Sequence, residues 1–525
     1  MKKRLTAVLL SALFLFSACS ERGADIVINA DGYEGMILAT EQSVAAPVSI
    51  PSVILTPTET TDTGENTDEA ADRSDETDRE TDETDAYIDN SESETASTTA
   101  PEPDTTTTIA QANTAAAVTT TTQEITATTT TQETATTTTE QTTTTTTTTT
   151  AAVTPPTGSN SYSALNYREV KGVWISYIEL YSILMGKSEG QFTSAIRQAF
   201  SNCADMGINT VYVHVRSHGD AYYPSQYFPW SRYVTGTVGQ APDFDPLEIM
   251  VREAHALGLS FQAWINPYRL CSSSDMKSVS SGYATGNWYD NSNGDRVVEV
   301  SGYYYLNPAY DEAIELITAG AREIVTNYNV DGIHIDDYFY PTTASSFDFK
   351  AFAASGYSSL SAFRMNNCDK TVKALYSAVK AGNSTALFGV APQGNLQNNY
   401  DYLYADVQKW CSGYGYLDYI APQIYFGFKN RSQPYETVLA QWQDMVSGTS
   451  IKLIPGLAVY KIGTDESAGE GVYEWRDDTQ IIKRQIEAAK AQSGYGGVIL
   501  YSYNYVFASS AAIKAEMDAV KSMFV

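Results

Sequence analysis

The stretch V-D-G-I-H-I-D-D-Y-F-Y-P, from Val330 to Pro341, has the pattern of a buried β-strand that ends in charged residues. Its apolar residues lead into two carboxylates, Asp336 and Asp337, which are followed by three aromatic residues and a proline. In parallel α/β sheets, ligands bind at the carboxyl ends of the strands. We therefore predict that the functional site includes Asp336 and Asp337.

Similar short apolar segments recur on both sides of this stretch and alternate with amphipathic segments of helical length. This alternation indicates βα units and a parallel sheet. Eight strands are expected, over residues 170–176, 209–216, 259–266, 330–336, 386–392, 417–424, 451–458 and 497–502. Eight such units predict an α/β fold of the (β/α)₈ or TIM-barrel type over residues 166–525. A doubly wound open sheet is the alternative, but no G-x-G-x-x-G motif follows the first strand.

The N-terminus has the pattern of a bacterial secretion signal. Three basic residues precede an apolar run, Leu5 to Phe16, which is shorter than a membrane span. The run ends in Ser17-Ala18-Cys19, which resembles a lipobox, in which the Cys becomes the lipidated first residue. We expect a lipoprotein signal peptide over residues 1–18 and a lipid anchor at Cys19, on the extracellular face of the cell membrane and within reach of the cell wall. Ordinary secretion is the alternative.

Residues 19–165 are expected to form a long disordered tether, because Thr, Ala, Asp and Glu dominate and hydrophobic periodicity is almost absent. Between Ser20 and Ala164 lie 26 acidic and three basic residues, which carry 23 of the 29 net negative charges. The acidic composition therefore describes the tether and says little about the ligand of the folded part. No nucleic-acid partner is expected.

Polar and aromatic residues follow most of the predicted strands, where a barrel places its active site. Aromatic rings that stack on sugars, with polar groups that pair with hydroxyls, are what a carbohydrate site requires. The candidate substrate-binding residues are Arg216, His218, Asp220, Trp264, Asn266, Tyr268, Arg269, His334, Tyr338, Gln393, Asn395, Gln423, Tyr425 and Tyr460. The two histidines are explained equally well as core residues. No cofactor or metal is expected, since no H-E-x-x-H or C-x-x-C spacing occurs.

Several segments match a known family in the same order along the chain. They include K-G-V-W-I-S, Y-V-H-V-R-S-H-G-D-A-Y-Y-P-S, A-W-I-N-P-Y-R, V-D-G-I-H-I-D-D-Y-F-Y-P and D-Y-I-A-P-Q-I-Y. Through them, from Tyr167 to about Gly463, the chain resembles the glycosyl-hydrolase-like 10 family. The resemblance implies a (β/α)₈ barrel and a surface-anchored glycoside hydrolase. Because members are implicated in cleaving peptidoglycan glycan strands stripped of their peptides, it also implies a wall polysaccharide as substrate.

Glycoside hydrolysis usually needs two carboxyl groups on opposite sides of the scissile bond. Neighbouring residues of a strand point to opposite faces, so Asp336 should face inward with His334, and Asp337 should join it only if the strand has ended. One of the two aspartates is predicted to be the general acid, with Asp337 slightly favoured, and the other to orient the substrate or stabilise charge. Asp220 is the best candidate for a further carboxylate.

The same strand also resembles the D-G-x-D-x-D-x-E strand of family 18 chitinases, whose substrates attack with their own acetamido group. Tyr338 stands in place of the catalytic Glu and His334 in place of an Asp, so the chitinase acid has no counterpart here. Asp336 would match the Asp that orients the acetamido group. Two further hypotheses stay open: a non-catalytic carbohydrate-binding barrel of the cell wall, and a glycosidase for another polysaccharide.

Overall fold

The computed structural model describes residues 157–291, 295–466 and 471–525, and the backbone of two short antiparallel strands, β1 (Asp25–Ile26) and β2 (Leu38–Ala39). The rest of the predicted signal peptide and tether, with Cys19, lies outside the described residues. The chain divides into two units, and the second, Thr134–Val525, holds every element from β3 onward.

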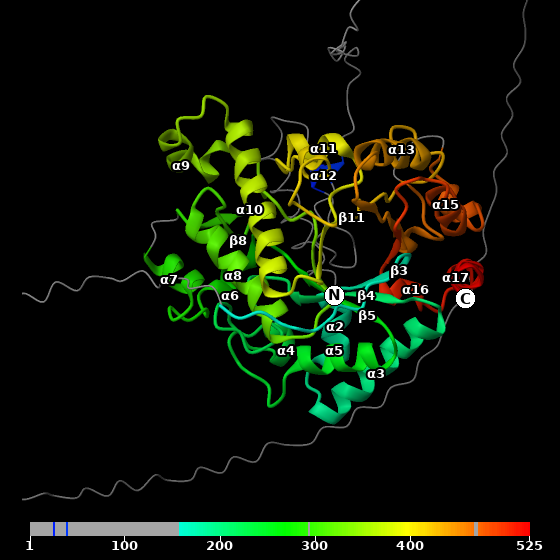
Figure 1. The fold of residues 1–525 in the computed structure, drawn as a ribbon, viewed down its shortest axis with the longest axis horizontal. Coiled ribbons are helices and arrows are strands. Elements are labelled where there is room, and N and C mark those ends of the chain that lie inside the picture. Colours follow the sequence, from blue (N-terminus) through cyan, green and yellow to red (C-terminus); the bar gives the residue numbers. More distant parts are fainter. Residues whose placement is uncertain (1–24, 27–37, 40–156, 292–294, 467–470) are drawn as a thin grey trace, which may run out of the picture. The chain divides into compact units, whose positions relative to one another are not determined.

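The second unit is built around a parallel β-sheet that closes on itself (Figure 1). Its strands are β3 (Val170–Ile175), β4 (Thr210–Arg216), β5 (Ser260–Ile265), β9 (Gly332–Ile335), β10 (Leu387–Val390), β11 (Tyr419–Ile420), β12 (Lys452–Leu453), β13 (Gly456–Ala458) and β14 (Gly497–Tyr501). β12 pairs with β11 and β13 pairs with β14, yet only Ile454 and Pro455 separate these two strands. A proline has no N–H to donate, so it interrupts one continuous strand. β12 and β13 are therefore halves of the seventh strand, and the fold is the predicted (β/α)₈ barrel.

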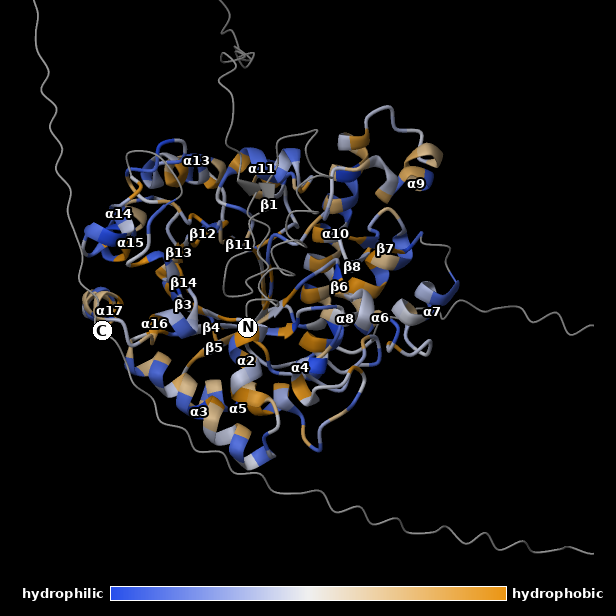
Figure 2. Ribbon diagram, turned by 180° about the vertical axis from the view of Figure 1, so that it is seen from behind, coloured by the Kyte–Doolittle hydropathy of each residue, from blue (hydrophilic) through white to orange (hydrophobic). Residues whose placement is uncertain are grey.

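Amphipathic helices cover the outside of the barrel (Figures 1 and 2). The main ones are α3 (Glu189–Asp205), α5 (Pro246–Ala256), α8 (Asp311–Asn327), α10 (Leu360–Gly382), α13 (Tyr435–Val446), α15 (Ile481–Lys490) and α17 (Ala511–Phe524). In α3 the buried residues recur at helical spacing from Phe192 through Ile196 and Ala199 to Cys203, which gives one apolar face. Ser188 and Gln191 form the capping box that starts it. None of the helices in the described residues is long and apolar enough to cross a membrane.

An insertion between β5 and α8 departs from the regular βα alternation, where the sequence indicated only a long loop. It contains a three-stranded antiparallel sheet in the order β6 (Arg269–Ser272), β8 (Tyr303–Leu306), β7 (Val297–Val300). Two helices, α6 (Ser273–Met276) and α7 (Ala284–Asn291), lie between β6 and β7 in the chain. Because β6 begins just after β5 ends, the insertion stands at the carboxyl-terminal end of the barrel, which we call the mouth.

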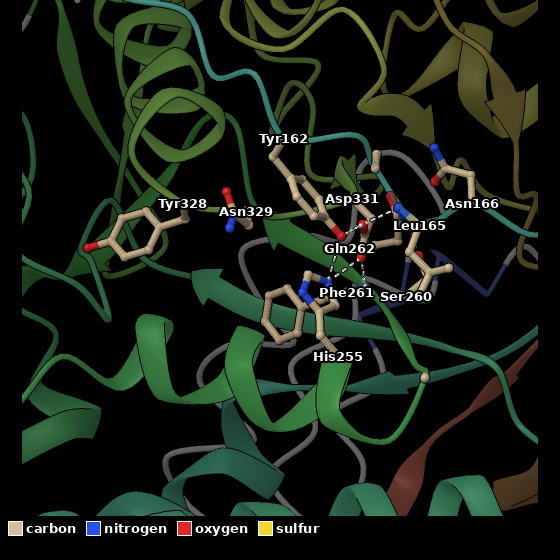
Figure 3. A network of polar contacts seen from close by, with 12 residues as sticks. Tyr162, Leu165, Asn166, His255, Ser260, Phe261, Gln262, Tyr328, Asn329 and Asp331 are labelled. Carbon is tan, nitrogen blue, oxygen red and sulfur yellow. Dashed lines mark hydrogen bonds and ion pairs between the residues drawn. The ribbon is translucent and has the colours of Figure 1, made fainter.

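The segment 157–169 lies at the opposite end, where the strands begin. Asp331, just before β9, is fully buried there, and its carboxylate accepts four hydrogen bonds (Figure 3). The donors are Tyr162 Oη at 2.9 Å, Leu165 N at 2.5 Å, His255 Nε2 at 2.9 Å and Phe261 N at 2.6 Å. The segment 157–169 thus joins the barrel at the end remote from the mouth.

Candidate active site

Asp336 and Asp337 lie at the mouth, just beyond the end of β9 at Ile335. Asp336 continues the inward alternation of the strand, as the sequence indicated, because Trp264 Nε1 donates a hydrogen bond to Asp336 Oδ2 over 3.0 Å. Asp337 is turned toward the neighbouring strands, since its Oδ1 accepts a hydrogen bond from Gln423 Nε2 at 3.1 Å. Both carboxyls therefore belong to one site, because the strand ends before them and strand alternation no longer separates them.

The two carboxyls differ in what stabilises their charge. Burial, followed by the negative charge of Asp337, raises the pKa of Asp336 well above its ordinary value. Burial also raises the pKa of Asp337, but hydrogen bonds from Gln423 and Gln393 stabilise its carboxylate and oppose the rise. Two adjacent carboxylates resist ionising together, and of the two, Asp336 keeps its proton to higher pH.

This arrangement predicts a pH-dependent gain of stability in Asp336→Asn. A carboxyl with a raised folded-state pKa costs stability once pH exceeds the unfolded-state value of about 4, because the unfolded chain ionises more easily. Asp336→Asn should therefore raise the free energy of unfolding by about 1 kcal/mol near pH 7.5 and by almost nothing near pH 4. Chemical denaturation across this pH range measures the difference.

The matched control is Asp477→Asn. Its exposed carboxylate pairs with Arg476, which lowers its pKa, so removing the charge should give no gain at neutral pH. A gain in Asp336→Asn that is equal at all pH values would contradict the raised pKa.

A layer of buried rings lies under the carboxyl pair. Trp174 Nε1 donates to His334 Nε2 over 3.0 Å, and since an indole only donates, His334 carries its proton on Nδ1 and donates it to Tyr419 Oη, also at 3.0 Å. Burial lowers the pKa of His334 to about 3, so the ring is neutral. His334 is therefore fully engaged inside the barrel. Nearer the mouth, the ring of His214 stacks on Trp264, 3.4 Å between centroids.

A wall of tyrosines rises on the side of β11, β13 and β14. The ring of Tyr425 lies 5.9 Å from Tyr460 and 5.6 Å from Tyr501, between centroids. Burial raises the pKa of Tyr425, with smaller contributions from Tyr460 and from the charges of both aspartates, so the wall adjoins the carboxyl pair. Tyr501 was missed from sequence, although its place as the last inward residue of the eighth strand marks it.

Arg269 and Tyr338 occupy the side of the mouth nearest the insertion. The guanidinium carbon of Arg269 lies 4.9 Å from the ring centroid of Tyr338 and 5.4 Å from that of Tyr303, another residue missed from sequence. The positive charge of Arg269 acts to lower the pKa of Asp336, against the larger effect of burial. The cation thus stands close enough to the pair to stabilise negative charge there.

The loop after β4 supplies the neighbouring part of the rim. Asp220 is buried, and its Oδ1 accepts hydrogen bonds from the backbone N–H groups of Ser217 and His218, so it braces this turn. The ring of His218 lies 4.7 Å from Tyr177 and 5.2 Å from Tyr233, both missed from sequence. No group of three or more His, Cys, Asp and Glu side chains within the described residues is placed to hold a metal.

Two predicted residues do not reach the mouth. The ladder between β4 and β5 shifts register between His214 and Arg216, which turns Arg216 outward. Its guanidinium packs 4.4 Å from the ring centroid of Phe228, and a Cβ added at Gly320 of α8 would meet it at 2.4 Å. Tyr268 is also buried outside the barrel, where its hydroxyl donates to Thr371 Oγ1 of α10 at 2.9 Å.

Three predicted amides hold local structure around the mouth. Asn395 caps helix α11 (Leu396–Asp401), since its side chain accepts hydrogen bonds from two backbone N–H groups of the first turn. Asn266 Oδ1 accepts a hydrogen bond from His214 Nε2 at 3.1 Å, and its amide nitrogen donates to Ser217 O. Gln393 pairs through its backbone with Gln423 across a β-bridge, which places both amides beside Asp337.

A (β/α)₈ barrel with a carboxyl pair and a tyrosine wall at its mouth has the architecture and the side chains that glycoside hydrolases use. The family model described as glycosyl hydrolase-like 10 matches residues 169–474, and the chain belongs to this family.

Two relatives carry glycosyl hydrolase names. Glycosyl hydrolase YngK of Bacillus subtilis (strain 168) is 30% identical over 359 residues, which cover 62% of this chain and 68% of that protein. Glycosyl hydrolase DigH of Escherichia coli (strain K12) is 30% identical over 392 residues, which cover 67% and 87% respectively. Among solved structures, the PgaB (BpsB) glycoside hydrolase domain from Bordetella bronchiseptica aligns with 67% of this chain and 99% of its own, at 13% identity and a TM-score of 0.43.

Proposed function

We propose that the protein is a glycoside hydrolase that cleaves peptide-free peptidoglycan glycan strands, with Asp336 as general acid. The observation that carries this proposal is the carboxyl pair beside the tyrosine wall, in which Asp336 is buried and Asp337 is partly exposed. Asp336 gives its proton to the leaving glycosidic oxygen as the C–O bond breaks. A water molecule then bonds through its oxygen to the anomeric carbon, and the proton that this water loses returns to the Asp336 carboxylate. Ionised Asp337, held by two amides, stabilises the positive charge that develops on the sugar ring.

Two features support a location at the cell wall: the pattern of the N-terminal sequence, and the end of the barrel at which the segment before β3 joins it. The N-terminal pattern ending in Cys19 is typical of a lipid anchor, and the acidic, Thr-rich segment after it is long enough to span part of the wall. The described chain joins the barrel beside Asp331, at the end remote from the mouth. An anchored protein would therefore leave its mouth free to face the glycan.

The direct test is to incubate the purified protein with peptide-free glycan strands and to analyse the products by mass spectrometry. We expect new reducing ends with the wild type and none with the Asp336→Asn, Asp337→Asn double variant. Glycan that binds to the wild type without any new reducing ends would contradict hydrolysis and favour a non-catalytic carbohydrate-binding barrel.

The choice of substrate is tested separately. Wall glycan, chitin oligomers and plant glucans are digested side by side under equal conditions. Peptide-free wall glycan should give the highest kcat/KM. If a plant glucan were cleaved faster, the protein would be a glycosidase for another polysaccharide.

The tyrosine wall gives a prediction about substrate binding. Tyr460→Ala should raise KM by about two- to tenfold with a smaller effect on kcat, because it removes a ring that can stack on a sugar. Tyr460→Phe keeps the ring and should stay close to the wild type. Steady-state kinetics on glycan oligomers measures both, and an equal loss in the two variants would contradict stacking.

A further inference from the structure

A small pocket opens at the mouth between the loop after β4 and the insertion after β5. Part of its lining is apolar or aromatic, from Trp230, Tyr233, Val238 and Val279. These side chains come from two separate loops that only the barrel brings together. Such a lining can enclose a methyl group or the C–H face of a sugar.

Arg269 lies between this pocket and the carboxyl pair. Its guanidinium carbon is 4.9 Å from the ring centroid of Tyr338, which follows Asp337, and 5.4 Å from that of Tyr303, which lines the pocket. The pocket therefore adjoins, through Arg269, the side of the mouth that carries the carboxyl pair. The pocket is placed to recognise a part of the substrate close to the reacting bond.

The polar lining of the pocket has no excess of positive charge, because it holds one guanidinium, Arg232, and two carboxyl groups, Asp275 and Asp220. Arg232 Nη1 lies 2.9 Å and 3.2 Å from the two carboxylate oxygens of Asp275, so the two charges compensate. His218 is buried, with Nδ1 2.8 Å from Ser217 Oγ, and its imidazole is neutral because burial lowers its pKa well below the ordinary value. The lining offers donors and acceptors without an excess cation, which suits a neutral polar group better than an anion.

The size of the pocket narrows the choice of ligand. Its volume is about 80 Å³, several times the roughly 10–15 Å³ that one water molecule requires. That space fits a substituent of a few heavy atoms and is too small to enclose a whole sugar. An N-acetyl group combines a methyl group, an amide donor and a carbonyl acceptor in this size.

We infer that the pocket is a subsite for the N-acetyl group of a hexosamine unit bound next to the cleaved bond. The methyl group packs against the apolar lining around Val238 and Val279, and the amide faces the Arg232–Asp275 pair. This inference rests on the proposed function and deepens it, because it restricts the substrate to N-acetylated glycans. A glycan that lacks the acetyl group should therefore bind more weakly, even when the rest of the glycan is unchanged.

The test is calorimetric titration of the full-length Asp336→Asn protein with β-1,4-linked hexamers of N-acetylglucosamine or of glucose. Both hexamers are neutral and have the same length, and they differ in the 2-substituent. Burial of a methyl group with one or two new hydrogen bonds should make the acetylated hexamer bind about tenfold or more tightly. Hexamers with a longer N-hexanoyl group should lose this advantage, because the pocket is small.

Two substitutions at one partly exposed position provide the matched comparison. Val238→Phe fills the pocket and should reduce the preference for the acetylated hexamer to about twofold or less. Val238→Thr keeps the shape of the side chain, so the preference should survive, which also controls for damage to the loop. Equal affinity for the two hexamers, no binding of either, or a preference that persists in Val238→Phe would overturn the inference. An intact acyl preference without hydrolysis by the wild type would overturn only the proposed function.

Discussion

Asp336→Asn should lower kcat/KM on peptide-free glycan strands by about 10²- to 10⁴-fold, because an amide cannot protonate the leaving oxygen. The same variant should keep most of its activity on an aryl glycoside whose leaving group departs without a proton. Steady-state rates on the two substrates measure this difference. Asp477→Asn, at an exposed carboxylate far along the sequence, serves as the control and should match the wild type on both.

Asp337→Asn should also be slow, but with a different pH profile. The charge of Asp337 raises the pKa of Asp336, so removing it should move the alkaline limb of kcat/KM to lower pH. If the alkaline limb of kcat/KM were absent in Asp337→Asn but present in Asp336→Asn, Asp337 would be the general acid instead. Full activity in both variants would exclude the carboxyl pair from the chemistry.

Asp331→Ala should reduce the free energy of unfolding by about 3–5 kcal/mol, the largest loss of stability that we expect from one substitution. The change removes a fully buried carboxylate and leaves the backbone N–H groups of Leu165 and Phe261 without their acceptor. It also removes two of the hydrogen bonds, from Tyr162 and Leu165, that hold the segment 157–169 to the bottom of the barrel. Urea denaturation followed by tryptophan fluorescence measures the loss.

The control for this prediction is Glu487→Ala, at a partly exposed carboxylate that lies 4.0 Å from Lys483 on one face of α15. Such surface pairs contribute little, so the midpoint should barely move. Activity per folded molecule should be retained in Asp331→Ala, because the mouth is at the other end of the barrel. A change in the midpoint as small as that of the control would show that the four hydrogen bonds contribute little.

Much of the barrel could be predicted because its signals are local. Each strand is a short run of apolar residues, and each helix repeats its buried side chains at the spacing seen in α3, so the count of eight needs no knowledge of distant contacts. The insertion after β5 could not be predicted in this way. Its strands are only four residues long and are stabilised by pairing with each other. Tyr305 of β8 pairs with Arg269 of β6 on one side and with Val298 of β7 on the other.

The carboxyl pair was found from sequence because both aspartates follow directly after a buried strand. The difference in their surroundings was not, since the amides that stabilise Asp337 follow β10 and β11, some 50 to 90 residues further along the chain. Sequence alone slightly favoured Asp337 as the acid. The hydrogen bond from Gln423 Nε2 and the deeper burial of Asp336 lead us to propose the reverse.

The sequence by itself determined the fold, the family and the placement of Asp336 and Asp337 at the carboxyl-terminal end of the barrel, because hydrophobic periodicity, family motifs and strand-end residues are properties of short segments. The tertiary structure decided which side chains meet there. A one-residue register shift turns Arg216 out of the mouth, while packing brings Tyr501, Tyr303 and Tyr233 to its rim. Such outcomes depend on strand pairing and loop contacts between residues far apart in the chain, and no short segment encodes them.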